Sequence, residues 1–149
     1  MGGILIACVG NIFYGDDAFG VEVAKYLSQR VLPKNVKVKD FGIRGIDLAF
    51  EISESYDLVI IVDTVKLGAE VGTVFVLEPK INQDTQFLTH DLTPETILKF
   101  AQNFENKPKK MLLIGCEPVN LEFHDEMSEA VKNAVEKAVE KVLELIKDA

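Results

Sequence analysis

Basic charge is scarce in this sequence of 149 residues. Lys and Arg together number 16 against 24 Asp and Glu, and the formal net charge is −8. A nucleic-acid-binding protein needs Lys and Arg to neutralise phosphates, and an anionic membrane surface attracts the same residues. The charge balance therefore argues against nucleic acid and against a membrane as partner. It leaves room for a basic peptide, because opposite charges favour encounter.

Long hydrophobic runs and a secretion signal are also missing. No apolar stretch reaches the roughly 20 residues that would span a bilayer. The first residues, Met1-Gly2-Gly3, carry no positive charge, and the apolar stretch 4–9 is too short for a signal-peptide core. We therefore expect a cytoplasmic protein. A length of 149 residues predicts one domain over residues 1–149.

Cysteine is nearly absent. Cys8 and Cys116 lie in apolar runs rather than in a CxxC or metal-binding spacing, so we expect two small buried hydrophobic residues. A disulfide framework is not expected in a cytoplasmic chain. The sequence also shows no Ser or Cys in a nucleophile-plus-base arrangement. If the protein hydrolyses a bond, water is favoured as the attacking group.

Apolar runs that alternate with amphipathic stretches predict an α/β fold. The runs 4–9, 58–62 and 111–114 are typical of strands buried on both faces, and the alternating run 36–39 is typical of a strand near a sheet edge. The link from Asp63 to Gly72 is too short for a parallel return, so strand 73–77 is predicted to be antiparallel or at an edge. Helices are predicted at 18–29, at 46–53, from Thr93 onward and at 126–147. The prediction is a three-layer αβα sandwich around a mostly parallel, twisted sheet of about five strands, one of them antiparallel.

Acidic residues and one histidine follow the predicted strands. Asp16 and Asp17 come after the first strand, Asp63 ends the central one, and His90 lies in a long irregular stretch after strand 73–77. Ligands of open parallel sheets bind outside the carboxyl ends of the strands. Two carboxylates and an imidazole suit a divalent metal such as nickel or zinc. The plain alternatives are helix capping by the two adjacent acids, a turn role for Asp63 and an exposed loop position for His90.

The segment after the first strand does not have the dinucleotide-binding pattern. Asn11 and Ile12 follow Gly10, whereas G-x-G-x-x-G requires a second glycine there. Two carboxylates at the start of a helix would also repel a pyrophosphate.

The same segment, GNIFYGDDAFG at residues 10–20, resembles the GN-x-x-x-x-D-[DE]-x-x-G signature of the hydrogenase maturation endopeptidases. Further similarities to that family follow in order at residues 40–48, 58–63, 72–73, 89–90 and 115–118. The resemblance thus covers nearly the whole chain. It implies an endopeptidase that removes the C-terminal extension of a [NiFe] hydrogenase large-subunit precursor after nickel insertion, and that recognises the bound nickel.

The resemblance also implies a ligand set. Asp17, Asp63 and His90 fall on the family's metal-binding positions, with Asp17 and Asp63 as catalytic carboxylates. Some members have Glu at the first position, so the shorter Asp17 leaves Asp16 as an alternative first ligand. Nickel would arrive in the substrate, and the isolated chain, expected to be a monomer, can then be metal-free.

Two questions stay open at this point. Gly42 and Gly45 most simply permit tight turns, and the functional interpretation is that the loop with Gly42, Arg44 and Gly45 receives the substrate's tail. A metal-sensing chaperone that docks on a precursor without cutting it would need the same three metal ligands as a peptidase.

Overall fold

A mixed β-sheet forms the centre of the molecule. The computed structural model describes residues 2–43, 45–52, 54–78 and 108–149, with only the backbone of residues 45, 46 and 49. Within these residues the sheet has the order β2-β1-β3-β5-β4, in which β1, β2, β3 and β5 are parallel and β4 is antiparallel to β5. The antiparallel strand and the edge position of β2 confirm the predictions made from the short link and from the alternating pattern. The strands are β1 (Gly3–Val9), β2 (Val36–Gly42), β3 (Tyr56–Thr64), β4 (Val74–Leu77) and β5 (Lys110–Cys116).

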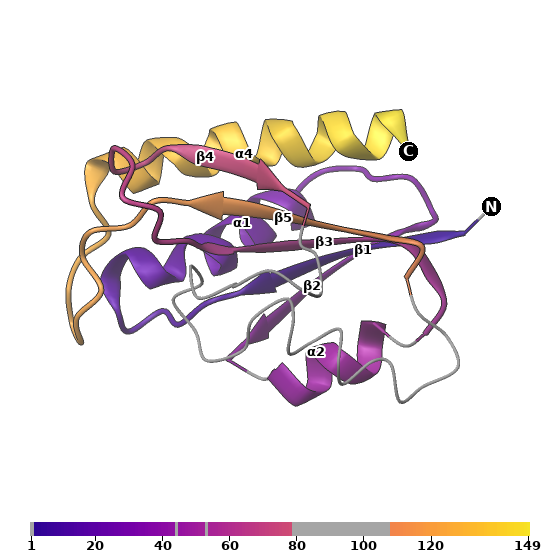
Figure 1. Cartoon of the computed structure of the whole chain (residues 1–149), viewed down its shortest axis with the longest axis horizontal. Coiled ribbons are helices and arrows are strands. Elements are labelled where there is room, and N and C mark those ends of the chain that lie inside the picture. The colour runs from indigo at the N-terminus through magenta and orange to yellow at the C-terminus, as the bar shows by residue number, and fades with distance from the viewer. Residues whose placement is uncertain (1, 44, 53, 79–107) are drawn as a thin grey trace.

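Helices cover both faces of the sheet and give the predicted three layers. α1 (Phe19–Ser28) and α4 (Glu129–Asp148) lie on one face, and α2 (Gly45–Ile52) lies on the other (Figure 1). Successive side chains of a strand point to opposite faces, so β1 contributes to two separate hydrophobic clusters. The cluster toward α1 and α4 contains Ile4, Ile6 and Cys8, and the cluster toward α2 contains Leu5, Ala7 and Val9.

Several element boundaries differ from the predictions. A 3-10 turn, η1 (Gly15–Ala18), precedes α1, and α4 begins at Glu129 rather than near 126. Phe50, an apolar residue of α2, is half exposed. An eight-residue helix turns one stripe of side chains to the sheet, here Leu48 and Ile52, and position 50 lies on the opposite side. The helix predicted from Thr93 lies outside the described residues.

A glycine brings α1 directly against the sheet. A Cβ atom at Gly20 would overlap the carbonyl oxygen of Val9 and would lie 2.8 Å from that of Val62. The first turn of α1 therefore packs on the carboxyl ends of β1 and β3, with η1 just before it. The loops after β1, β3 and β5 gather at this end, toward which the arrows of the parallel strands point in Figure 1. Within the described residues, no helix has the length and apolar character needed to cross a membrane.

Candidate active site

Two buried carboxylates lie around Thr64 at the carboxyl edge of the sheet. Asp17 in η1 is 8% exposed and Asp63 near the end of β3 is 1% exposed. Both carboxylates accept hydrogen bonds from Thr64, the last residue of β3. The Thr64 hydroxyl donates to Oδ1 of Asp17 at 3.2 Å, and the Thr64 backbone N–H donates to Oδ1 of Asp63 at 2.7 Å. The structure therefore brings together the two acids predicted for the site, although 46 positions separate them in the sequence.

Asp16 has a different environment. It is fully buried, and its carboxylate accepts hydrogen bonds of 2.7–2.9 Å from the backbone N–H groups of Val119, Asn120 and Ser128. The Ser128 hydroxyl, at 3.0 and 3.1 Å from the two carboxylate oxygens, donates as well. Ser128 is the N-cap of α4, so the negative charge also lies at the positive end of that helix.

Helix capping does not describe the two adjacent acids. At the N-caps of η1 and α1, Tyr14 and Ala18, no side-chain capping hydrogen bond is present. The hydrogen bonds of Asp16 instead join the loop after β1 to the segment between β5 and α4. This carboxylate therefore fixes the position of η1, and with it the backbone that carries Asp17.

A fourth buried carboxylate, that of Glu117, orders the loop after β3. Glu117, 6% exposed, accepts hydrogen bonds from the backbone N–H groups of Leu67 and Ala69 at 2.8 and 3.0 Å. Its backbone carbonyl accepts a bond from Gly72 N–H at 2.9 Å, and its own N–H donates to Thr73 at 3.0 Å. The chain immediately beyond Asp63 and Thr64 is thereby held against the end of β5.

The glycine loop predicted for substrate binding borders the same edge. Gly42 ends β2 with φ +56°, a left-handed conformation that favours glycine. Its carbonyl oxygen accepts a bond from Gly10 N–H at 3.0 Å, and its N–H donates to Asp40 at 2.8 Å. Gly45 begins α2. Arg44 lies outside the described residues.

The predicted third metal ligand, His90, lies outside the described residues as well. In the parts of the chain that the structure describes, no group of three or more His, Cys, Asp and Glu side chains is arranged to hold a metal ion. The complete triad therefore stays a prediction. Asp17 and Asp63 are two buried carboxylates that both accept hydrogen bonds from Thr64, and carboxylates of this kind are general ligands for divalent cations and general bases.

Both cysteines are buried free thiols, as predicted. Burial, with a smaller contribution from Asp40, raises the pKa of Cys8. Burial and the negative charges of Asp16 and Glu117 raise the pKa of Cys116 to about 12. Because the thiolate is the nucleophilic form, neither side chain is suited to attack a peptide bond near neutral pH.

Sequence reasoning missed three residues that shape this site. Thr64, Glu117 and Ser128 contact residues between 47 and 112 positions away, and no local pattern marks such contacts. For Ser128 the sequence did offer a signal: a serine just before a long amphipathic helix is typical of an N-cap.

The described residues thus form an α/β fold with two buried acids, Asp17 and Asp63, at the carboxyl edge of a mostly parallel sheet. The family model HycI, hydrogenase maturation protease, matches residues 21–145. This chain belongs to the hydrogenase maturation protease family.

Individual relatives agree with this assignment. The hydrogenase expression/formation protein HupD of Rhizobium leguminosarum bv. viciae is 32% identical over 124 residues, which cover 80% of this chain and 61% of HupD. The hydrogenase 2 maturation protease of Escherichia coli is 30% identical over 138 residues, covering 87% of this chain and 81% of the relative. The chain spans only 61% and 64% of the first two curated relatives it matches.

Solved structures show the same architecture. The hydrogenase maturating endopeptidase HybD from E. coli superimposes with a TM-score of 0.85 at 29% identity, covering 98% of this chain and 93% of HybD. The hydrogenase 2 maturation peptidase from a Thaumarchaeota archaeon gives a TM-score of 0.75 at 34% identity, with 97% of each chain covered.

Proposed function

We propose that this chain is an endopeptidase that removes the C-terminal extension of a [NiFe] hydrogenase large-subunit precursor after nickel has been inserted. Membership of the hydrogenase maturation protease family supports the reaction class and the partner. The observation that carries the proposal is the pair of buried carboxylates, Asp17 and Asp63, that both accept hydrogen bonds from Thr64. The carboxyl edge of a parallel sheet is where ligands of such folds bind, and carboxylate oxygens are ligands for a divalent cation.

The nickel ion belongs to the substrate in this proposal. Asp17 and Asp63 provide oxygen ligands and His90 a nitrogen ligand, a set suited to a borderline divalent metal. Asp17 is preferred over Asp16 as the first acid, because the carboxylate of Asp16 already accepts bonds from three backbone N–H groups and a hydroxyl. Moving Asp16 onto a metal would leave those buried donors without their acceptor.

Hydrolysis follows from the same groups. The oxygen of a water molecule attacks the carbonyl carbon of the scissile peptide, while Asp17 or Asp63 takes the water proton as general base. The same carboxyl then gives this proton to the amide nitrogen as the C–N bond breaks. The ion carried by the substrate can polarise the carbonyl or lower the pKa of the water. In this proposal the loop with Gly42, Arg44 and Gly45 receives the substrate's tail, and the Arg44 guanidinium pairs with a carboxylate there.

Mass spectrometry of a nickel-loaded precursor tests the proposal. The precursor should lose its C-terminal extension when it is incubated with the wild-type protein. The Asp63→Asn and His90→Ala variants should be at least 100-fold slower, the order expected when a general base or metal ligand is removed. Unimpaired processing by His90→Ala would rule out the ligand assignment. An intact precursor in a stable complex with the wild-type protein would instead indicate a chaperone.

A further inference from the structure

Exposed apolar side chains gather on two loops at the carboxyl edge of the sheet. Ile12, Phe13 and Tyr14 follow β1 and are 61%, 58% and 38% exposed, and Val119 and Phe123, both 58% exposed, follow β5. We call these five residues the apolar rim. Water-exposed side chains of this size, grouped on neighbouring loops, are typical of a protein-binding surface.

The apolar rim is built as one surface. The rings of Tyr14 and Phe123 lie 5.6 Å apart, and the ring of His124 lies 3.8 Å from that of Phe123. The carbonyl oxygen of Phe13 accepts a hydrogen bond from His124 N–H at 2.8 Å. The buried carboxylate of Asp16 joins the same two loops, because it accepts hydrogen bonds from the N–H groups of Val119 and Asn120. A partner would therefore meet an ordered surface and would lose little affinity to ordering of the loops.

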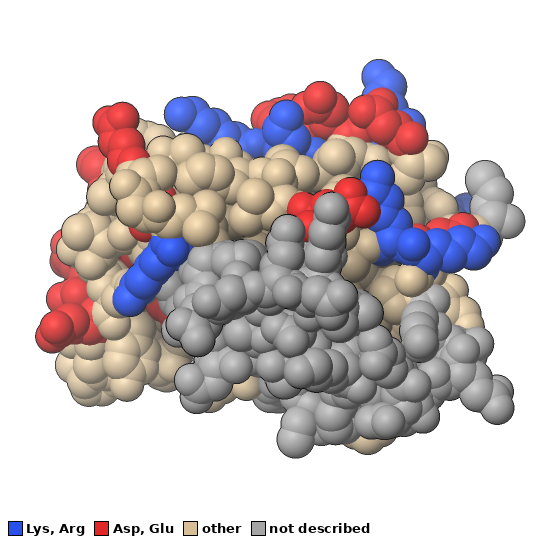
Figure 2. All heavy atoms as spheres, viewed as in Figure 1, with Lys and Arg blue, Asp and Glu red and all other residues tan. Residues whose placement is uncertain are grey.

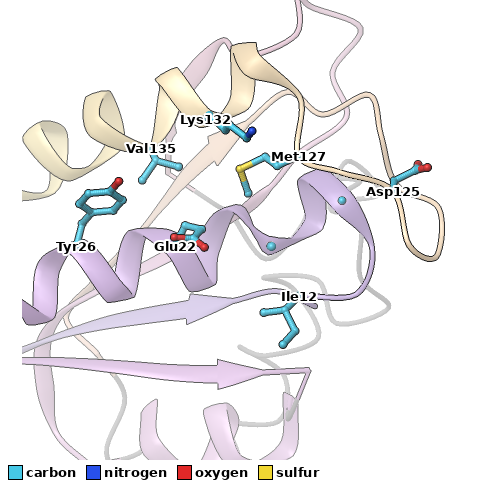
Figure 3. A pocket seen from close by; sticks show the side chains of 9 residues that line it. Ile12, Glu22, Tyr26, Asp125, Met127, Lys132 and Val135 are labelled. Atoms are coloured by element: carbon cyan, nitrogen blue, oxygen red, sulfur yellow. The ribbon is translucent and has the colours of Figure 1, made fainter.

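A groove continues the apolar rim between α1 and α4. It has a volume of about 400 Å³ and begins at Ile12. Figure 3 shows Tyr26 on α1 and Val135 on α4 on its two sides, with Met127 nearer the loops. Apolar side chains thus extend from the loops along the helices. This surface is long enough to bind an extended peptide or one face of a helix.

The charge around the apolar rim is negative. Residues 10–24 and 111–131 contain no Lys or Arg. The loop between β5 and α4 instead exposes the three acids Glu122, Asp125 and Glu126, and Glu22 lines the groove. Acidic atoms are visible at this end of the molecule, at the left in Figure 2, together with a basic side chain; Lys66, in the loop after β3, is exposed. Lys132, on α4 between Met127 and Val135 in Figure 3, is the basic residue among those that line the groove. Such a surface repels anionic lipids and a second copy of this acidic chain, and it attracts a cationic segment.

We propose that the apolar rim and the adjoining groove dock a segment of the precursor that carries apolar side chains together with Lys or Arg. This inference rests on the proposed function for the identity of the partner. Asn11 N–H donates to the carbonyl oxygen of Asp17 at 3.1 Å, so the loop that bears three of the five rim residues is bonded directly to Asp17. A precursor held there has its tail next to Asp17 and Asp63. Docking and cleavage are then separate functions of adjoining surfaces.

Binding of the full-length nickel-loaded precursor to the immobilised protein tests the docking surface. The Ile12→Ser/Phe13→Ser variant should bind at least tenfold more weakly and should show a raised KM with little change in kcat. The control Val31→Ser/Val76→Ser removes two exposed apolar side chains elsewhere and should bind like the wild type. Circular dichroism and thermal melting establish that both variants are folded, and Phe123→Ser provides an independent change in the second loop.

Charge is tested in the same assay. Glu122→Gln/Glu126→Gln should weaken binding about threefold at low ionic strength and should flatten its salt dependence, because surface attraction is screened by salt. Glu136→Gln/Asp148→Asn removes the same charge from exposed positions of α4 and should have no such effect.

Each outcome decides between the two proposals. If the wild type cuts the precursor and the Ile12→Ser/Phe13→Ser variant binds as well as the wild type, the docking surface is wrong and the proposed function stands. If the wild type binds through the apolar rim but never cuts, the proposed function fails and the docking surface stands. Dimerisation of the wild type that is lost in the Ile12→Ser/Phe13→Ser variant, measured by sedimentation, would overturn the docking proposal in favour of a second copy of the chain.

Discussion

Asp16 and Asp17 are neighbours in the chain but have different structural roles. The carboxylate of Asp16 accepts its hydrogen bonds from Val119, Asn120 and Ser128, whereas that of Asp17 accepts one from Thr64. The first acid joins the loops to α4, and the second faces the end of β3. The two side chains diverge because η1 is a tight turn between a strand and a helix, so consecutive residues point to different neighbours.

The structural role of Asp16 can be tested with an isosteric change. Asp16→Asn replaces a charged acceptor with an amide whose NH2 group is a donor. That NH2 group would face N–H and O–H groups that are themselves donors. We expect a loss of about 3 kcal/mol in the free energy of unfolding, since hydrogen bonds to a buried charged group are worth more than neutral ones. Urea denaturation measures it. Asp57→Asn, which affects an ion pair with the largely exposed Lys109, should cost less than about 1 kcal/mol. Equal losses in the two variants would contradict the account.

The sequence could identify the acids at this edge but not the different roles of Asp16 and Asp17. The position of Asp17 and Asp63 after apolar runs placed both at the carboxyl ends of neighbouring strands, because parallel strands end at a common edge. The partners of Asp16 lie more than 100 positions away. Contacts across that separation depend on tertiary packing, which local patterns do not encode.

At the scale of single elements, α1 depends on its contact with the sheet. A side chain at Gly20 would overlap the backbone of β1, and backbone cannot move aside as a flexible side chain can. Gly20→Ala should therefore destabilise the fold by about 3 kcal/mol, as overpacking does. Thermal unfolding followed by circular dichroism gives the value. Gly68→Ala is a useful comparison, because Gly68 has φ +77° but open space around it, so only backbone strain of about 1 kcal/mol is expected. A milder effect at Gly20 than at Gly68 would show that α1 can shift freely.

A cluster around Glu51 attaches α2 to the sheet. The carboxylate accepts hydrogen bonds from Tyr56 at 2.7 Å, from Lys37 at 3.2 Å and from Lys39 at 3.3 Å. Burial alone would raise the pKa of Glu51, but the bonds from Tyr56 and the two lysines outweigh it and leave the pKa below its ordinary value. The ionised form therefore stabilises α2 against β2 and the start of β3.

This lowered pKa predicts a dependence of stability on pH. In the unfolded chain Glu51 titrates near a pKa of about 4.3. Its stabilising contribution is complete above that value and disappears as the pH falls through the lower folded pKa. Glu51→Gln should thus lose about 1 kcal/mol at neutral pH and should approach the wild type in acid. The free energies of unfolding, measured for both proteins from pH 7 to pH 2, check this, and a difference that grows on acidification would contradict it.

The apolar patterns of the single strands and helices, together with the length of one link, were sufficient to predict most of the fold. Strands buried on both faces gave continuous apolar runs, and the short link between β3 and β4 correctly predicted the antiparallel strand. Helix ends were less accurate. α4 begins at Glu129 because Ser128 is bonded to Asp16, a contact that the apolar periodicity from Met127 onward does not show.

At the scale of the whole molecule, the parallel strands and the loops that follow them gather the candidate functional residues at one end. The acids, the glycine of the β2 loop and the apolar rim all lie at the carboxyl edge, because the chain leaves β1, β2, β3 and β5 on the same side. The family resemblance, rather than residue patterns alone, predicted His90 as the third ligand, since no spacing links it to Asp17 or Asp63.

The central claim is that Asp17, Asp63 and His90 bind one nickel ion. The chain contains only two histidines, His90 and His124, so the imidazole signals of a histidine-labelled sample can be assigned by one substitution. Titration with Ni²⁺ followed by NMR should broaden the His90 signal selectively and leave that of His124 unchanged. In Asp17→Asn and Asp63→Asn the broadening should require at least tenfold more nickel. Broadening of His124 alone, or of His90 at the same nickel concentration in both variants, would contradict the account.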